Sequence, residues 1–310
     1  MDKTTRNKII VSISLFALLA TSKYTVDRVA SNANQKIISW GQENTSSVQL
    51  VAHRGYSNMY PDNSLEGLTA CNDLQCISGI ECDVRLTKDN KLILMHNDYI
   101  GFNPVEKFTY DELRNMNLSG DLASRTLAFK GFNIKEQEIL AKRYEKMQDM
   151  SYTLCTLEEL LSKRDKSKIL FIDIKFSGYN DDLLLTKVGE LIKGEENIII
   201  QSFDEAMLRR MLELYPDYNY QLLIDTRRGL DNIDYIFDAY GIKYKLLEED
   251  TVEDLIEHDK QVSLWTIDSY KDFKLLYEQY GEYGDDIYYI SNNPDLIGYQ
   301  YTKSLKKGWK

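Results

Sequence analysis

The chain has 310 residues, of which 43% are hydrophobic, and a formal net charge of -11 at pH 7. A chain of this length buries either one large α/β barrel core or the cores of two smaller domains. The acidic balance, without a basic run in the part expected to fold, argues against nucleic acid as a partner, because the phosphate backbone requires a basic surface. Any phosphate group that this chain recognises must therefore be bound by a few local side chains.

The first 30 residues have the pattern of an export signal. Lys3, Arg6 and Lys8 precede the run Ile9–Ala20, which has twelve residues and no charge. This run is short for a permanent membrane span, which usually needs about 17 to 25 apolar residues, and no A-x-A cleavage site follows it. We expect residues 1–30 to be a cleaved signal peptide or a short signal-anchor, with a buried N-terminal helix as the less favoured alternative. The catalytic part is then expected outside the cytoplasm, either secreted or tethered to the membrane.

Residues 31–47 are rich in Asn, Gln and Ser and are predicted to form an extended linker. Residues 48–300 follow as one folded unit, and residues 301–310 as a basic C-terminal tail. Within the folded unit, short β-branched or aromatic runs alternate with helical periodicity. The predicted strands are Gln49–Ala52, Gly79–Arg85, Lys91–Met95, Lys168–Ile174, Asn197–Gln201, Tyr218–Ile224, Ile242–Leu247, Gln261–Ile267 and Asp286–Ser291.

About eight βα units in this length favour an α/β fold of the (β/α)8 TIM-barrel type over a two-domain doubly wound sheet. Helical patterns separate most of the strands, including one predicted over Asp231–Ala239. Residues 99–153 are too long for a single βα connection and become strongly charged toward their end. They are predicted to be an inserted, lid-like helical segment over the mouth of the barrel.

Polar residues recur where the predicted strands end, which is where TIM barrels carry their functional side chains. Glu81 and Asp83 are two residues apart on one strand, so both side chains project to the same face, here the barrel interior. Asp173 and Lys175 repeat this spacing on a later strand. Three converging carboxylates repel one another unless a divalent cation neutralises them, and an all-oxygen ligand set suits Mg²⁺ or Ca²⁺.

His53 and His96 follow the first strand and the hairpin-like extension of the second. Two imidazoles around a carboxylate cluster indicate metal-assisted acid–base chemistry. Arg54 and Gly55 follow His53, and this pair suits a phosphate, because Gly permits a close backbone approach and Arg supplies a bidentate fork. Trp265 ends a later strand and is either a wall for the substrate's alcohol group or a core aromatic residue.

The four cysteines contain no C-x-x-C pair, so a zinc site built from thiolates is not expected. Cys71 and Cys76 lie on one predicted helix and Cys82 lies on the next strand. We expect buried free thiols, with a disulfide from Cys82 to that helix as the alternative in an oxidising compartment.

Ten short runs in chain order carry a resemblance to a known family. They are His53-Arg54-Gly55, Pro61-Asp62-Asn63-Ser64, Gly79-Ile80-Glu81-Cys82-Asp83-Val84, Thr87-Lys88-Asp89, His96, Thr156-Leu157-Glu158-Glu159, Ile172-Asp173-Ile174-Lys175, Gln201-Ser202-Phe203-Asp204, Trp265-Thr266-Ile267-Asp268 and Ser291-Asn292-Asn293-Pro294-Asp295. The set resembles the glycerophosphodiester phosphodiesterase family of the PLC-like phosphodiesterase TIM-barrel superfamily. It spans nearly everything from Val48 to Tyr299.

The resemblance implies a TIM-type barrel, one divalent cation, and hydrolysis of glycerophosphodiesters to an alcohol and glycerol phosphate. It also implies a role for each matching residue, in agreement with the roles argued from residue chemistry. The implied metal ligands are Glu81, Asp83 and Asp173, the acid–base pair is His53 and His96, and the phosphate-binding residues are Arg54 and Lys175.

Three departures from the family pattern bear on the substrate and the metal. Its Pro-Glu-Asn-Thr element is Pro61-Asp62-Asn63-Ser64 here, and its third metal carboxylate, usually Glu, is Asp173. An Asp at that position resembles the related sphingomyelinase D-like phospholipases. The Leu-x-Arg-Thr-Thr run that commonly follows the second histidine is absent after His96, where Tyr99–Asn103 stands instead.

Two alternatives accompany this interpretation. The first is the same chemistry on a lysophospholipid, a phospholipid or a glycerophosphate-containing polymer of the cell surface, consistent with an exported chain. The second is a non-catalytic ligand-binding barrel. Retention of both histidines, all three carboxylates, Arg54 and Lys175 weighs against the second alternative.

Overall fold

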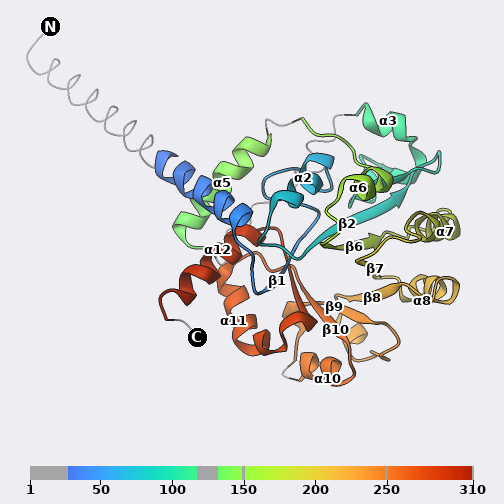
Figure 1. Ribbon diagram of the computed structural model, residues 1–310. Coiled ribbons are helices and arrows are strands. Elements are labelled where there is room, and N and C mark those ends of the chain that lie inside the picture. The colour runs from blue at the N-terminus through green and yellow to red at the C-terminus, as the bar shows by residue number, and fades with distance from the viewer. Residues whose placement is uncertain (1–26, 117–131, 149–150, 249, 309–310) are drawn as a thin grey trace, which may run out of the picture.

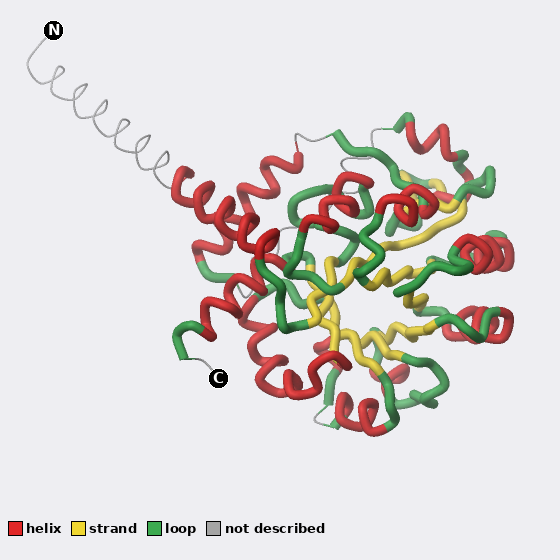
Figure 2. The backbone as a smooth tube through the Cα atoms, viewed as in Figure 1, coloured by secondary structure: helices red, strands yellow, loops and turns green. Residues whose placement is uncertain are grey.

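The computed structural model describes residues 27–116, 132–148, 151–248 and 250–308. Within these residues, eight parallel strands form a closed barrel surrounded by helices (Figure 1, Figure 2). In sheet order the strands are β1 (Gln49–Ala52), β11 (Ile287–Ser291), β10 (Gln261–Trp265), β9 (Ala239–Lys243), β8 (Asn219–Ile224), β7 (Ile198–Ser202), β6 (Ile169–Ile174) and β2 (Gly79–Leu86). Pairing of Val51 in β1 with Gly79 in β2 closes the ring, which confirms the predicted TIM-type barrel.

Helices on the outside of the barrel return the chain from each strand to the next. They are α2 (Leu65–Ala70), α6 (Leu157–Lys163), α7 (Asp181–Leu191), α8 (Glu205–Leu214), α9 (Arg227–Leu230), α10 (Thr251–Glu257), α11 (Tyr270–Tyr280) and α12 (Pro294–Leu305). Several begin at the hydroxyl or carboxyl N-caps that the sequence provides. Thr156 and Glu159, for example, form a capping box at the start of α6.

The alternation of side chains along a strand positions the polar groups. In β6, Ile172 packs outward in the main core between strands and helices, whereas Phe171 packs inside the barrel beside Val51 and Tyr288. Asp173, two residues after Phe171, therefore also points inward, at the carboxyl end of its strand. The same end of the barrel receives the last inward-facing residues of the other strands.

One strand differs from its predicted position. The pattern predicts a helix over Asp231–Ala239 and a strand over Ile242–Leu247, but the strand is Ala239–Lys243. Gly241 explains the shift, because a Cβ atom there would lie 2.5 Å from the Cδ2 atom of Leu223 on the neighbouring strand. Only a residue without a side chain allows the two strands to approach this closely, and residues 231–238 before the strand form turns and irregular backbone instead of the predicted helix.

The insert between β2 and β6 contains β3 (Leu92–Leu94), β4 (Tyr99–Ile100), β5 (Asn103–Pro104), α3 (Tyr110–Arg114) and α5 (Ile134–Gln148). Its two helices lie apart: α3 packs near β3, and α5 lies beside α12 (Figure 1). Within the described residues, neither helix lines the central cavity, so the predicted helical lid over the mouth is not formed by them. Residues 117–131 and 149–150 of the predicted lid lie outside the described part of the chain.

The predicted extended linker over residues 31–47 is wrong. Residues 27–43 form a helix, which we call the N-terminal helix, and its Ala30 and Ile37 are buried. Ile37 packs against Ile139 of α5 and Leu296 of α12. The segment was predicted to be a linker because most of its residues are polar. Its few apolar residues, however, recur at helical spacing and form a narrow apolar face, and packing of that face against the rest of the protein stabilises the helix.

The predicted tail over residues 301–310 is also shorter than expected. Helix α12 continues to Leu305, because buried Tyr301 packs against Phe273 and Tyr277 of α11. The apolar run Ile9–Ala20, on which the signal or anchor prediction rests, lies outside the described residues. No helix among the described residues is both long and apolar enough to span a bilayer.

A buried ion pair attaches α5 to the barrel. Arg143 donates two hydrogen bonds to Asp295, Nη1 to Oδ1 at 3.0 Å and Nη2 to Oδ2 at 2.6 Å, and neither side chain is exposed. The Tyr56 hydroxyl donates to the same carboxylate at 2.5 Å, and Arg143 Nε donates to Asn34 of the N-terminal helix at 2.6 Å. This cluster joins four segments that are far apart in the sequence.

We expect Arg143→Ala to lower the free energy of unfolding by about 3 kcal/mol, because the substitution leaves the Asp295 charge buried without its partner. Chemical denaturation of the full chain measures this loss. The control is Lys146→Ala on the exposed face of the same helix, which we expect to change the value by less than about 0.5 kcal/mol. Equal values for the two variants would contradict a structural role for the pair.

Candidate active site

The loop after β1 approaches the end of β2 through two residues with left-handed backbone. Arg54 has φ +58° and Gly55 has φ +81°, and a Cβ atom on Gly55 would lie 3.0 Å from the backbone of Gly67. The Arg54 backbone N–H donates to Glu81 Oε2 at 2.8 Å, and the Gly55 N–H donates to the Glu81 carbonyl at 3.1 Å. A positive φ at a residue other than Gly is uncommon and concentrates at functional sites.

Three buried carboxylates converge where β2 and β6 end. Asp83 and Asp173 are register partners in the two paired strands, and Glu81 lies on the same face of β2. One oxygen atom from each of the three lies within 4.8 Å of the others. Asp173 Oδ1 is buried and has no hydrogen-bond partner among the described residues. An unpartnered buried acceptor beside two further carboxylates fits a divalent cation with oxygen ligands.

Two cations hold part of this negative charge. Lys175 Nζ lies 2.9 Å from Asp83 Oδ1 and also contacts Asp173, while Arg54 Nε lies 3.4 Å from Asp83 Oδ2. Burial alone would raise the pKa of Asp83, but Lys175 and Arg54 outweigh burial and hold that pKa below its usual range. Asp83 is therefore the carboxylate of the cluster that is most firmly ionised.

The other two carboxylates are less well compensated. Burial raises the pKa of Glu81 well above its usual range, and the charges of Asp83 and Asp173 add to this effect. Burial also raises the pKa of Asp173 to about 6, against the attraction of Lys175. Burial and mutual repulsion thus disfavour the charged forms of Glu81 and Asp173, and a divalent cation would stabilise both carboxylates as anions.

The Pro61-Asp62-Asn63-Ser64 element supports the cluster from one side. Asn63 Nδ2 donates to Asp83 Oδ2 at 2.7 Å, and Asn63 Oδ1 accepts from the Asp83 backbone N–H at 3.0 Å. Asp62 Oδ2 accepts from Arg54 Nη1 at 3.0 Å. The element therefore orients one carboxylate and the arginine, so the local hydrogen bonding expected for this variant of the family pattern is present.

His53 is oriented by a chain of hydrogen bonds from the last strand. Asn292 donates from its backbone N–H and its Nδ2 to the two carboxylate oxygens of Asp268, at 2.9 and 2.8 Å. This fixes the amide so that Asn292 Oδ1 faces His53 Nδ1 at 2.8 Å. Nδ1 therefore carries the proton, and Nε2, 3.8 Å from Glu81 Oε2, is the proton-accepting nitrogen of the neutral ring.

His96 follows β3 and lies close enough to Asp83, Arg54 and Lys175 for their charges to act on its ring. Its backbone carbonyl accepts from Arg85 Nη2 at 3.0 Å, and Arg85 is itself buried and paired with Asp98 and with Glu106. Burial lowers the pKa of His96, although the charge of Asp83 opposes this shift. Arg85 of β2 therefore holds the backbone of the second histidine, independently of the Tyr99–Asn103 segment that replaces the family's Leu-x-Arg-Thr-Thr run.

These groups line one cavity of about 110 Å³ at the carboxyl ends of the strands. Its apolar side is formed by Trp265 and Phe203, whose rings meet edge to face at 5.5 Å between centroids. Lys175 Nζ lies 5.5 Å from the Phe203 ring, and Trp265 Nε1 is buried without a hydrogen-bond partner among the described residues. Trp265 lines the cavity and also packs against the apolar cluster inside the barrel, so both alternatives predicted for it stay open.

All eight residues predicted from the sequence line this cavity: His53, Arg54, Glu81, Asp83, His96, Asp173, Lys175 and Trp265. Residue-level reasoning assigned no role to Asn292, Asp268 or Phe203, although all three lie in the motifs that carry the family resemblance. Their functions depend on contacts across the barrel that spacing does not reveal. The four cysteines lie elsewhere and are buried free thiols, as expected.

Comparison with protein families gives a match over residues 53–281 to the "Glycerophosphoryl diester phosphodiesterase family". The chain belongs to this family. It is therefore a phosphoric diester hydrolase. Among curated relatives, a glycerophosphodiester phosphodiesterase of Bacillus subtilis is 23% identical over 282 residues, covering 84% of this chain and 87% of its own. A glycerophosphodiester phosphodiesterase of Caldanaerobacter subterraneus is 25% identical over 240 residues, covering 73% of this chain and 88% of its own.

Solved structures show the same fold. An Oleispira antarctica phosphodiesterase in complex with the product sn-glycerol-3-phosphate aligns with a TM-score of 0.61 at 20% identity, covering 80% of this chain and 94% of that chain. A glycerophosphodiester phosphodiesterase from Parabacteroides distasonis aligns with a TM-score of 0.59 at 19% identity, covering 84% of this chain and 100% of that chain. The family's divalent-metal dependence agrees with the acidic cluster.

Proposed function

We propose that this glycerophosphoryl diester phosphodiesterase hydrolyses small glycerophosphodiesters to an alcohol and glycerol phosphate, using one divalent cation and the two histidines. The observation that carries the proposal is the single cavity in which two imidazoles, three carboxylates and two cationic side chains face one another. The relatives' named activity supports the substrate class. No other set of groups in the described residues combines these three chemistries.

Glu81, Asp83 and Asp173 are the proposed ligands of the cation. An all-oxygen donor set suits Mg²⁺ and Ca²⁺, and the buried, unpartnered Oδ1 of Asp173 provides an acceptor for either ion. When bound, the ion would supply positive charge to a non-bridging oxygen of the phosphodiester. Lys175, which now contacts Asp83 and Asp173, would then have the phosphate as an additional anionic partner.

The chain's own residues would bind the phosphate and move the protons. Arg54 and Lys175 both contact Asp83 and line the cavity, where they would present positive charge to the phosphate. One histidine takes a proton from the attacking hydroxyl or water, while a new P–O bond forms and the P–O bond to the alcohol breaks. The other histidine gives a proton to the departing alkoxide. The unpartnered Trp265 indole N–H and the Phe203 ring would contact the alcohol part.

The hydrogen-bond chain behind His53 predicts a positioning role for Asn292. We expect Asn292→Ala to lower kcat about 10- to 100-fold with little change in KM, because the ring loses the acceptor that fixes its tautomer. Asn292→Asp retains an oxygen at that position but places it against the Asp268 carboxylate, so it should not rescue activity. The control is Asn232→Ala, an exposed amide elsewhere in the barrel. If Asn292→Ala instead lost divalent-ion binding and kept its kcat, the proposed role of Asn292 in positioning His53 would be contradicted.

The function is tested by turnover on glycerophosphocholine, glycerophosphoglycerol and a lysophospholipid, each with Mg²⁺, Ca²⁺ or EDTA. We expect release of glycerol phosphate from the two small diesters and loss of this release in EDTA. Turnover of the lysophospholipid alone would move the proposal to a lipid substrate with the same chemistry. Turnover that persists undiminished in EDTA would contradict the proposed metal dependence.

We further propose that the chain is exported, with the predicted segment 1–30 as a cleaved signal or a membrane tether. Residues 27–30 belong to the N-terminal helix, where Ala30 is buried, so any cleavage would precede residue 27. The basic flank and the uncharged run Ile9–Ala20 support this proposal. Fusing residues 1–47 to a phosphatase that is active only outside the cytoplasm should give phosphatase activity. Absence of that activity, with the fusion protein intact inside the cell, would contradict export.

A further inference from the structure

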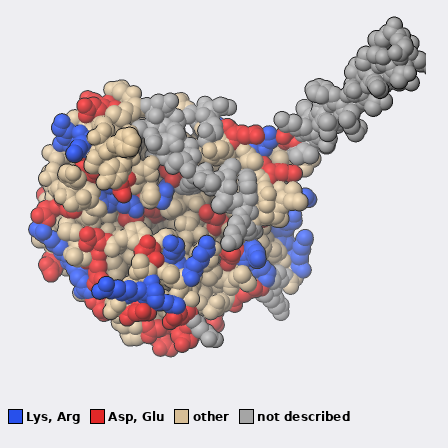
Figure 3. Space-filling model, turned by 180° about the vertical axis from the view of Figure 1, so that it is seen from behind, with Lys and Arg blue, Asp and Glu red and all other residues tan. Residues whose placement is uncertain are grey.

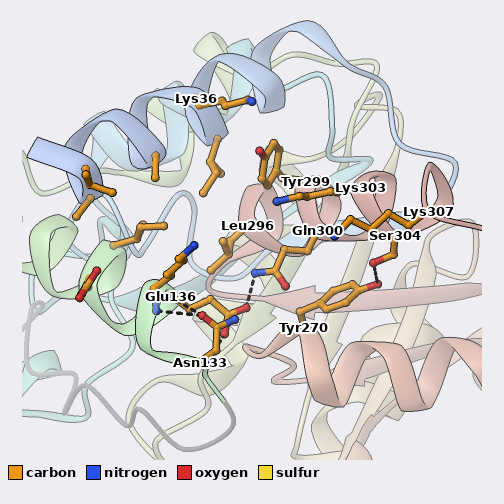
Figure 4. A pocket seen from close by; sticks show the side chains of 17 residues that line it. Lys36, Asn133, Glu136, Tyr270, Leu296, Tyr299, Gln300, Lys303, Ser304 and Lys307 are labelled. Atoms are coloured by element: carbon orange, nitrogen blue, oxygen red, sulfur yellow. Dashed lines mark hydrogen bonds between the residues drawn. The ribbon is translucent and has the colours of Figure 1, made fainter. Parts of the chain in front are cut away.

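A second cavity of about 390 Å³ lies between the N-terminal helix, α5 and α12, and it shares no lining residue with the active-site cavity (Figure 4). Its apolar lining comes from Val29, Ala33 and Ile37 of the N-terminal helix, Ile139 of α5 and Leu296 of α12. Ile37, Ile139 and Leu296 belong to one buried apolar cluster. This volume lies within the range of pockets that hold small molecules in proteins.

Four lysines surround this apolar lining. Lys36, Lys303 and Lys307 lie on one side of the pocket around Tyr299, and Lys135 lines it from α5 (Figure 4). All four are exposed, and within the described residues none of their ammonium groups forms an ion pair with a carboxylate. In a chain with a net charge of -11, such a group of cations is a local departure from the overall charge.

The two acidic side chains of the pocket do not cancel this charge. Glu136 is buried, and its carboxylate accepts from the Asn133 backbone N–H at 2.6 Å and from the Gln300 side chain. Figure 4 places Asn133 and Glu136 on the side opposite Lys303 and Lys307. Glu138 also lines the pocket, which leaves four cationic groups against two anionic groups.

We propose that this cavity binds a single-chain anionic lipid, with the hydrocarbon chain on the apolar lining and the anionic head group among the lysines. The combination of an apolar interior with exposed cations at one side is complementary to an amphiphile rather than to a free anion, which needs no apolar contact. A partner protein is less well matched, because a specific interface needs about 800 Å² on each side, whereas this cavity has the size of a small-molecule pocket.

Calorimetric titration of the full chain tests this proposal with dodecyl phosphate, kept below its micellar concentration. Dodecyl phosphate is a phosphate monoester, so the phosphodiesterase reaction does not consume it. We expect saturable binding of one molecule per chain that persists in saturating glycerol 3-phosphate, which occupies the active site. Neutral monolaurin should bind about tenfold more weakly, because it lacks the charge that the lysines recognise.

Two variants locate the binding. Ala33→Phe fills the apolar part of the cavity and should weaken dodecyl phosphate binding at least about tenfold. The triple variant Lys36→Ala, Lys303→Ala and Lys307→Ala should remove the preference for dodecyl phosphate over monolaurin. Its matched control replaces the exposed Lys163, Lys193 and Lys271 by Ala and should keep that preference. Thermal melting shows whether each variant is folded, and the surface triple variant decides the test if Ala33→Phe is not.

Several results would overturn the proposal. The first is that dodecyl phosphate shows no saturable binding to the wild type, and the second is that glycerol 3-phosphate abolishes its binding. The third is that inorganic phosphate competes for the site as well as dodecyl phosphate does. The fourth is that the two lysine triple variants bind dodecyl phosphate equally. Binding of an amphipathic acidic peptide but not of dodecyl phosphate would likewise replace the lipid by a protein partner. None of these measurements requires turnover. Only the competition with glycerol 3-phosphate rests on the proposed function, and the comparison of the two lysine triple variants does not depend on it.

Discussion

Asp173→Asn is expected to abolish phosphodiester turnover while making the metal-free protein more stable than the wild type. The buried Asp173 carboxylate has a pKa of about 6 in the folded chain, above its ordinary value of 3.8, because burial disfavours its charge. Such a group destabilises the folded state at every pH above 6, and this penalty disappears as the pH falls toward 3.8. The amide removes the charge and keeps an oxygen that accepts from Lys175.

At pH 7.5 in EDTA, we expect Asp173→Asn to raise the free energy of unfolding by about 1 to 2 kcal/mol, and at pH 4 by much less. Adding Mg²⁺ or Ca²⁺ should reverse the order, because an ion that binds only the folded wild type stabilises it by mass action. Turnover of the variant should fall by more than about 100-fold. This exceeds the loss that is typical for a residue that only hydrogen-bonds to a metal ligand and does not bind the metal itself.

The control for this reversal of the stability order by the metal ion is Asp217→Asn, which makes the same chemical change at an exposed position. It should alter neither the turnover nor the response of thermal stability to the metal ion. If Asp173→Asn retained the metal-induced stabilisation of the wild type, Asp173 would not be a ligand, and the cation site would have to be sought among other groups.

The second large effect is expected at the histidines. His53→Ala and His96→Ala should each lower kcat about 10²- to 10⁴-fold, the usual contribution of a positioned acid or base. Both variants keep the three carboxylates, so stabilisation by Mg²⁺ or Ca²⁺ should persist. The double variant should lose little more than the stronger single variant, because the two groups act as one unit in proton transfer.

Steady-state kinetics with glycerophosphoglycerol and thermal melting with and without metal ion measure the two properties separately. His258→Ala provides the control, because this third histidine is exposed at the end of α10 and does not line the cavity. Activity within a factor of about three in either catalytic variant would contradict the two-histidine mechanism.

The barrel and most of the residues that line the cavity could be predicted from the sequence. Val51, Ile80 and Phe171 lie in strands that the sequence shows as apolar runs, and the polar residues His53, Asp83 and Asp173 stand toward the ends of those runs. In a parallel barrel all such ends meet on one face, so spacing along the chain becomes proximity in space.

Other parts depend on contacts that spacing does not encode. The orientation of His53 requires Asn292, 239 residues later, and Asn292 in turn requires Asp268. The N-terminal helix folds because Ile37 packs against Ile139 and Leu296, residues from two distant segments. A composition rich in Asn, Gln and Ser predicted an extended linker there, but packing of a narrow apolar face outweighed composition.

The same limit applies to the pocket between the N-terminal helix, α5 and α12. Its lysines lie on three helices, and only the fold brings them together around a shared apolar lining. Arg143 and Asp295, which join two of these segments, are 152 residues apart and show no pattern in the sequence that pairs them.

The central claim is that the cluster of Glu81, Asp83 and Asp173 holds a divalent cation needed for phosphodiester hydrolysis. The most direct test is to remove metal ions from the purified full chain and titrate Mg²⁺ or Ca²⁺ back while recording turnover of glycerophosphoglycerol and the amount of ion bound. We predict no turnover in the stripped protein and a saturable return of activity as one ion binds per chain, with neither in Asp173→Asn. Full turnover in the stripped wild type would contradict the claim.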